Sequence, residues 1–280
     1  MSETMTDDGS DAPTPAHPAY GVVREVTPFA SVLLCDNPGV MELDGTNTWI
    51  LRAPDSPDCV IVDPGPPKHK HHVRKIADEY DVSMILVTHR HHDHTGGIDR
   101  LHKSTGAPVR ARAKRFCRNA RPLHDREVID VAGLRIRVLF TPGHTGDSVS
   151  FLVDCNGTHA MITGDTILGR GTTVLDPSDG SLNDYMNSLN RLIVEGDGCT
   201  LLPAHGPDHP DLIPVARFYK AHREERIDQI RAALADMGVT PQRAKPMKVV
   251  KRVYSDVDKE LWPAARMSVK AQLEYLRHNS

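Results

Sequence analysis

Several features that would assign the chain to a specialised class of protein are scarce or missing. Its five cysteines contain no Cys-x-x-Cys pair, which argues against a disulfide framework and favours a reducing compartment. No apolar stretch approaches the ~20 residues of a membrane-spanning helix. Aromatic residues make up 5% of the chain, so the sequence shows no obvious base-stacking platform for nucleic acid. The net charge of −3 excludes a molecule that attracts polyanions over its whole surface.

The N-terminal segment also lacks the marks of a secretion signal. Residues 1–19 carry four acids and three prolines but no lysine or arginine, whereas a signal peptide needs a basic start and an apolar run. We expect residues 1–19 to form a disordered tail. We also expect a cytoplasmic protein with no membrane partner.

Hydrophobic periodicity from residue 20 onwards predicts strands that alternate with single helices. Strands are expected over 20–26, 31–36, 47–54, 58–65, 82–89, 134–143, 148–154, 159–165 and 199–206. Helices are expected over 67–80, 96–106, 182–196 and 215–237, followed by one or two more near the end of the chain. This order predicts an α/β fold in which two sheets pack face to face with helices outside. We expect one domain over 20–213 and a mostly helical module over 214–280.

Four motifs carry the polar chemistry, and each follows an apolar strand beside glycine or proline. They are HRHHDH at 89–94, TPGHTGDS at 141–148, ITGDTILG at 162–169 and LPAHGPDH at 202–209. Loops held by a rigid sheet are where functional groups concentrate. Imidazole nitrogens and carboxylate oxygens are good ligands for Zn²⁺ and, more weakly, for Fe²⁺ or Mn²⁺. The motifs supply enough ligands for two ions, and a single aspartate could bridge them.

The motif His89-x-His91-x-Asp93-His94, followed by His144, Asp165 and His205, resembles the metallo-β-lactamase superfamily. The resemblance implies an αββα sandwich with a two-metal site on one edge. It places His89, His91 and His144 on the first metal, and Asp93, His94 and His205 on the second, with Asp165 between them. It also implies that Asp93 orients the attacking water. His92 fills a variable position and is given no ligand role.

Further motifs resemble the beta-lactamase-like protein 2 subgroup, which carries a small winged-helix-like C-terminal module. They are GTNTWIL at 45–51, GDTILGRGTTV at 164–174, DYMNSLNRL at 184–192, AHGP at 204–207 and HREERIDQI at 222–230. Members of this subgroup include endoribonucleases selective for single strands, and related fungal proteins are acyl-carrier-protein thioesterases. The resemblance therefore implies an enzyme that holds two divalent ions, expected to be Zn²⁺, and uses a metal-bridging hydroxide for hydrolysis.

The substrate stays open at this point. Single-stranded RNA is one candidate, and a small ester, thioester, lactone or lactam is the alternative, as in the glyoxalase II branch. Glyoxalase II proteins share the seven ligands but have a different C-terminal domain. A non-catalytic metal-binding or redox protein is a remote third possibility, because the flavodoxin-like extension of the flavin-linked members has no counterpart here. The sequence does not predict an oligomeric state.

Two features have a plain reading beside the functional one. Asp63 is either a turn residue at a strand end or, as in the family, a buttress beneath a ligand histidine. The stretch 109–122 has six basic residues and no acid. It is either a solvated helix face or a phosphate-tracking patch for RNA, with contacts from Arg110, Arg112, Lys114 and Arg115. The neighbouring HKHH at 69–72 is interpreted as a solvated surface cluster.

Overall fold

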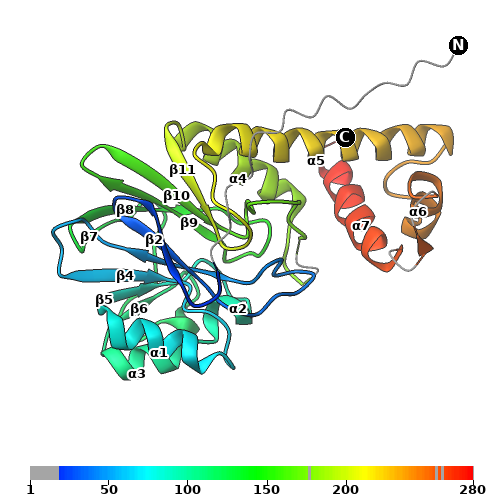
Figure 1. Ribbon diagram of the computed structural model, residues 1–280. Coiled ribbons are helices and arrows are strands. Elements are labelled where there is room, and N and C mark those ends of the chain that lie inside the picture. The colour runs from blue at the N-terminus through cyan, green and yellow to red at the C-terminus, as the bar shows by residue number, and fades with distance from the viewer. Residues whose placement is uncertain (1–18, 176–177, 256–257, 260–261, 280) are drawn as a thin grey trace, which may run out of the picture.

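The computed structural model describes residues 19–175, 178–255, 258–259 and 262–279. Its first layer is a six-stranded sheet in the order β1-β2-β3-β4-β5-β6 (Figure 1). The strands are β1 (Val23–Thr27), β2 (Ala30–Leu34), β3 (Asn47–Leu51), β4 (Asp58–Val62), β5 (Asp81–Leu86) and β6 (Val109–Arg110). Neighbouring strands from β1 to β4 are antiparallel to one another, and β5 and β6 continue the sheet parallel to β4.

The second layer is a five-stranded sheet in the order β11-β10-β9-β8-β7. Its strands are β7 (Val128–Val131), β8 (Leu134–Phe140), β9 (Val149–Cys155), β10 (Thr158–Gly164) and β11 (Cys199–Pro203). β8 and β10 are both antiparallel to β9, and β11 is parallel to β10. The carboxyl ends of β8, β10 and β11 therefore lie at one edge of this sheet.

Helices cover both outer faces. The first sheet is covered by α1 (Lys70–Glu79) and α3 (Ile98–Thr105). The short helix α2 (His92–Thr95) precedes α3, and the 3-10 turn η1 (Lys114–Phe116) follows β6. The second is covered by α4 (Leu182–Glu195) and the start of α5 (Leu212–Asp236), and α6 (Pro246–Val253) and α7 (Trp262–His278) follow (Figure 1). The predicted αββα sandwich with a helical C-terminal module is confirmed.

Three apolar clusters hold these layers together, because side chains alternate across each strand. Between the sheets, Trp49 and Val62 of the first sheet belong to the same buried cluster as Phe151 and Ile162 of the second. A second cluster joins the outer face of the first sheet to α1 and α3. The third joins the outer face of the second sheet to α4, α5, α6 and α7. The C-terminal helices are thus packed on the sandwich rather than tethered to it.

The sequence patterns located most of the elements. Four short ones were not predicted, namely the strands β6 and β7 and the helical turns α2 and η1. α5 begins at Leu212, near the predicted module boundary at 214. The predicted tail at 1–19 lies almost wholly outside the described residues. Within the described ranges, none of the helices has the length and apolar character needed to cross a bilayer.

Candidate metal centre

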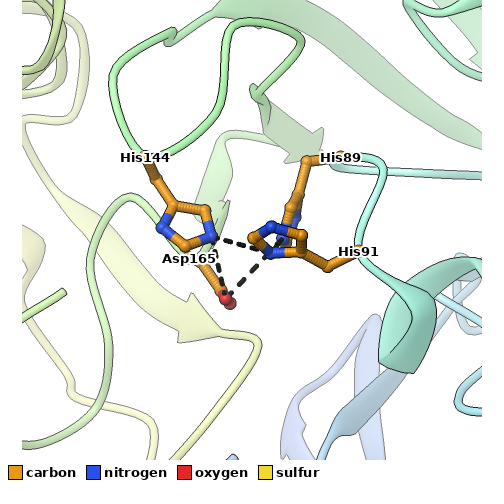
Figure 2. A group of neighbouring side chains, drawn as sticks. All are labelled: His89, His91, His144 and Asp165. Carbon is orange, nitrogen blue, oxygen red and sulfur yellow. Dashed lines mark hydrogen bonds and ion pairs between the residues drawn. The ribbon is translucent and has the colours of Figure 1, made fainter. Parts of the chain in front are cut away.

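The fold brings all seven predicted ligands to the edge where the strands end. The ligand atoms form two groups, each with its members within 4.8 Å of one another. The first ligand group, shown in Figure 2, consists of His89, His91, His144 and Asp165. The second ligand group lies beside it and consists of Asp93, His94 and His205. They come from the ends of β5, β8, β10 and β11 and from α2. His92 belongs to neither group and is exposed.

Hydrogen bonds outside the first ligand group determine which nitrogen each histidine presents. The Nδ1 of His144 lies 2.6 Å from the carbonyl oxygen of Val174 and donates to it. The Nδ1 of His89 lies 3.1 Å from the hydroxyl of Thr88. Both rings therefore present an unprotonated Nε2 to the centre of the group. His91 presents its Nδ1, which lies 2.9 Å from the Nε2 of His89 and 3.1 Å from that of His144.

The second ligand group is arranged in the same way. The Nδ1 of His205 donates to the carbonyl oxygen of Gly45 at 3.0 Å, so its Nε2 faces inward. The Oδ2 of Asp93 lies 2.9 Å from the Nε2 of His94 and 3.2 Å from that of His205. The hydroxyl of Thr46 donates to the same oxygen at 3.1 Å. Thr46 therefore holds the Asp93 carboxylate in place.

Asp165 lies between the two groups and offers one oxygen to each. Its Oδ2 is 3.7 Å from the Nε2 of His89 and 3.4 Å from that of His144. Its Oδ1 is 3.6 Å from the Nε2 of His94 and 3.3 Å from that of His205. A carboxylate oriented in this way is suited to bridge two cations.

Asp63 lies beneath the groups and contacts neighbours of both. Its Oδ1 accepts the backbone N–H of Thr88 at 2.8 Å, and its Oδ2 accepts the Thr88 hydroxyl at 2.6 Å. The Nδ1 of His94 donates to Oδ2 at 2.8 Å. Since Thr88 in turn accepts from His89, Asp63 fixes one histidine of each group. Its φ of +54° is a left-handed conformation that aspartate tolerates better than most residues. These contacts favour the buttress over the plain turn.

The arrangement fits cations better than it fits a hydrogen-bonded network. Two facing nitrogens of the first group, on His89 and His144, carry no proton, so the His91 nitrogen cannot satisfy both. Among the described residues, the Nε2 of His94 and the Oδ1 of Asp165 are buried next to opposite charge but form no hydrogen bond of proper geometry. Ligand nitrogens around a tetrahedral ion at 2.0–2.1 Å lie roughly 3.3 Å apart, close to the separations of 2.9 and 3.1 Å in the first group.

The electrostatics of the site also call for positive charge. Burial disfavours the charged form of His94 and His205. Even so, Asp93 and Asp165 raise the pKa of His94 well above its usual value, and Asp165 and Asp93 raise that of His205 to about 10. Burial opposes ionisation of Asp93 and Asp165 too, but the adjacent imidazoles hold the pKa of both below the usual range. The buried carboxylates therefore stabilise positive charge on the neighbouring imidazoles. Divalent cations can supply that positive charge instead.

The prediction that the HKHH stretch at 69–72 is a solvated surface cluster is wrong for His72. His72 is 9% exposed, and burial, aided by His69, lowers its pKa to about 4. Its Nε2 lies 2.8 Å from the hydroxyl of Thr48, which donates to the carbonyl oxygen of Asp63 at 2.6 Å. His72 thus supports the backbone of Asp63. Val73 and Ile76 face inward on α1. The helical period places residue 72 on the same face, and this was the signal in the sequence that His72 is buried.

The basic stretch is not a helix face, and its first member is corrected. Arg110, at the end of β6, is 7% exposed and forms an ion pair with Glu127 at 2.7 Å. Its guanidinium is buried and paired within the fold, so the predicted phosphate contact of Arg110 is wrong. Arg112 is half-buried with its guanidinium carbon 4.3 Å from the centre of the Phe140 ring. Lys114 and Arg115 are exposed on η1.

Comparison with known proteins places these features in context. The model of the metallo-beta-lactamase superfamily matches residues 41–205, and that of the beta-lactamase associated winged helix domain matches residues 246–278. A beta-lactamase-like protein 2 homolog of Drosophila melanogaster is 31% identical, with 91% of this chain and 89% of that protein aligned. An atrochrysone carboxyl ACP thioesterase of Aspergillus chevalieri is 32% identical over 76% of this chain and 68% of that protein.

Solved structures show the same architecture. A beta-lactamase domain protein from Burkholderia ambifaria superposes with a TM-score of 0.76 over 95% of this chain and 90% of that chain. The two sequences are 21% identical, so this likeness bears on the fold alone.

Proposed function

Because the chain belongs to the metallo-beta-lactamase superfamily, whose members are generally hydrolases, we propose that it is a binuclear metal-dependent hydrolase of acyl thioesters. The observation that carries the binuclear proposal is the position of Asp165, with one oxygen toward each ligand group. Its fold, its ligand groups and its C-terminal helices are those expected for the beta-lactamase-like protein 2 type.

The ligand groups determine which ions the site would take. His89, His91 and His144 would hold one, Asp93, His94 and His205 the other, and Asp165 would contact both. Nitrogen and carboxylate donors of this kind suit Zn²⁺. Two such ions would supply a hydroxide nucleophile at neutral pH and polarise the carbonyl oxygen of a thioester.

The protein's own part in the reaction is to fix the ligands and to orient the water. Thr46 fixes the Asp93 carboxylate by donating a hydrogen bond to its Oδ2. A carboxylate fixed in this way accepts a hydrogen bond from the attacking water and directs its lone pair toward the substrate. Asp93 is therefore the proposed catalytic residue.

Two observations support an acyl substrate over RNA. One relative is named as a thioesterase. The loop between β2 and Thr46 carries two exposed apolar side chains, Val40 at 96% and Met41 at 53% exposure. Exposed apolar side chains can contact apolar parts of a ligand, and an acyl chain has such parts. The loss of Arg110 as a surface cation weakens the phosphate-tracking patch.

Single-stranded RNA is the second candidate, favoured by the exposed cations that remain. Lys114 and Arg115 lie on η1, and Lys248 and Lys251 are exposed on α6. Such residues could contact phosphates.

A substrate panel distinguishes these possibilities. Zinc-loaded protein is assayed with an acyl N-acetylcysteamine thioester, a single-stranded RNA and a chromogenic lactam. We expect turnover of the thioester, and a loss of about 100-fold or more in Asp93→Asn, because the water is no longer oriented. The matched control is Asp208→Asn, which changes a buried carboxylate between β11 and α5 that pairs with Arg24 instead.

The contrary result is equally clear. RNA cleavage that depends on Asp93, with no thioester turnover, would replace the acyl proposal with a nuclease. In that case the double variant Lys114→Glu/Arg115→Glu should weaken RNA cleavage and leave small esters unaffected.

A further inference from the structure

The segment between β10 and α4 contacts three of the seven ligand residues through its backbone and one side chain. We call residues 168–175 the strap. The carbonyl oxygen of Val174 accepts from the Nδ1 of His144 at 2.6 Å. The hydroxyl of Thr173 donates to the carbonyl oxygen of Asp165 at 2.5 Å. The backbone N–H of Gly169 donates to the carbonyl oxygen of His205 at 2.8 Å. A shift of the strap would therefore move ligands of both groups.

Helix α5 holds the strap from the side away from the metals. The Tyr219 hydroxyl accepts from the backbone N–H of Leu168 at 3.0 Å and lies 3.3 Å from the carbonyl oxygen of the same residue. Arg223 donates from its guanidinium to the carbonyl oxygen of Thr173. Residues 219 and 223 are one helical turn apart, so they share a face of α5. That face is directed at both ends of the strap.

The role of Arg223 in the fold is to hold the strap. The guanidinium is half-buried, with its central carbon 5.2 Å from the centre of the Tyr185 ring. Burial raises the pKa of Tyr185 to about 12, and its hydroxyl donates to the carbonyl oxygen of Thr166 at 2.7 Å. Within the described ranges Arg223 forms no ion pair, so its charge is directed at a backbone carbonyl. A charge-assisted hydrogen bond of this kind is about twice as strong as a neutral one.

The other half of α5 belongs to the C-terminal module. Ile227, Ile230 and Leu234 pack in one apolar cluster with Val250 of α6 and Leu273 of α7. Figure 1 shows α5 running from above the second sheet to the pair α6 and α7. One rigid helix therefore connects that module to the strap.

We propose that Arg223 is a positioning residue for the first ligand group. By holding the Thr173 carbonyl it fixes the adjoining peptide, whose Val174 carbonyl orients His144. Through α5, the C-terminal module then contributes to how tightly the first metal is held. This inference rests on the proposed binuclear function, because it assumes a metal between His89, His91 and His144.

Metal binding tests the inference without reference to activity. Arg223→Met keeps the stem that packs beside Tyr185 but removes every donor. Arg223→Lys restores one donor. The matched control is Arg226→Met, also half-buried on α5, whose guanidinium lies 5.7 Å from the Tyr254 ring centre instead of on the strap. Zinc affinity is measured for each protein by competition with a chromogenic chelator, and folding by circular dichroism.

We expect Arg223→Met to weaken one of the two zinc equivalents by about 10- to 100-fold, the usual cost of losing an outer partner of a ligand histidine. The other equivalent should be weakened less, because Tyr219 still holds the Leu168 end of the strap, where Gly169 contacts His205. Arg223→Lys should recover part of the loss, and Arg226→Met should bind like the unsubstituted protein. If Arg223→Met does not fold, Arg223→Lys carries the same test with a smaller expected loss.

The outcomes separate the inference from the function on which it rests. Unsubstituted protein that binds no zinc would overturn the proposed function itself. Unsubstituted protein that binds two equivalents, with Arg223→Met or a folded Arg223→Lys binding both at the same affinity, would overturn the role of Arg223 alone. Equal weakening in Arg226→Met would show a general effect of α5 and would also contradict the inference.

Discussion

Replacing Asp165 with asparagine is expected to lower the bound metal from two equivalents to at most one and to abolish most of the activity. The substitution keeps the size of the side chain but removes its charge and exchanges one oxygen for an NH₂ group, which is no ligand. Each oxygen of Asp165 faces a different ligand group, so neither amide orientation serves both. The rate should fall by more than about 100-fold, the upper end of the cost of losing an outer partner. Elemental analysis and the thioester assay check both values.

The control for this substitution is again Asp208→Asn, which removes a carboxylate that does not face the ligand groups. It should keep two equivalents of metal. Asp165→Asn protein that still binds two equivalents with unchanged affinity would show that Asp165 does not bridge.

Replacing Asp63 with asparagine is expected to weaken metal binding in both groups by about 10- to 100-fold. Asp63 accepts a hydrogen bond from His94 and, through the Thr88 hydroxyl, sets the orientation of His89. An amide NH₂ at the Oδ2 position would donate to the Nδ1 of His94 and push the ring proton to Nε2, the atom that faces the metal. Asparagine also adopts the left-handed backbone conformation at φ +54°, so the variant should still fold. Zinc competition titration measures the loss.

The matched control is Asp58→Asn at the other end of β4, where the carboxylate accepts from Ser56 at 2.6 Å. It should leave zinc affinity unchanged. An affinity for both equivalents in Asp63→Asn equal to that of the unsubstituted protein would contradict the buttress role.

The sequence predicted two packed sheets because strands alternate with single helices, and it predicted the site because four apolar strands are followed at once by a polar motif. VSMILVTH and CTLLPAHG show this pattern, and both end at histidines that the fold brings together. The family pattern then separated His92 from its neighbours, since a histidine-rich stretch alone does not say which rings face inward. Strand direction explains why the ligands gather, because β5, β8, β10 and β11 all end where the two groups lie. The division into two groups was implied by the family resemblance.

What could not be predicted depends on partners distant in sequence. Arg110 carries the same chemistry as Lys114, yet Glu127 lies beside Arg110 only because β6 ends there. The strap has no periodic pattern, and its contacts are made by backbone atoms that any residue possesses. β7 is four residues long, too short for alternation to stand out. The helical period could have shown that His72 is buried, but not its hydrogen bond, because the partner, Thr48, is on another element.

Titration of metal-free protein with Zn²⁺, followed by thioester hydrolysis, tests the central claim most directly. The account predicts no activity without metal, a rise with each addition, and a plateau at two equivalents per chain. Activity that is already complete in metal-free protein, or that never appears when two equivalents are bound, would contradict it.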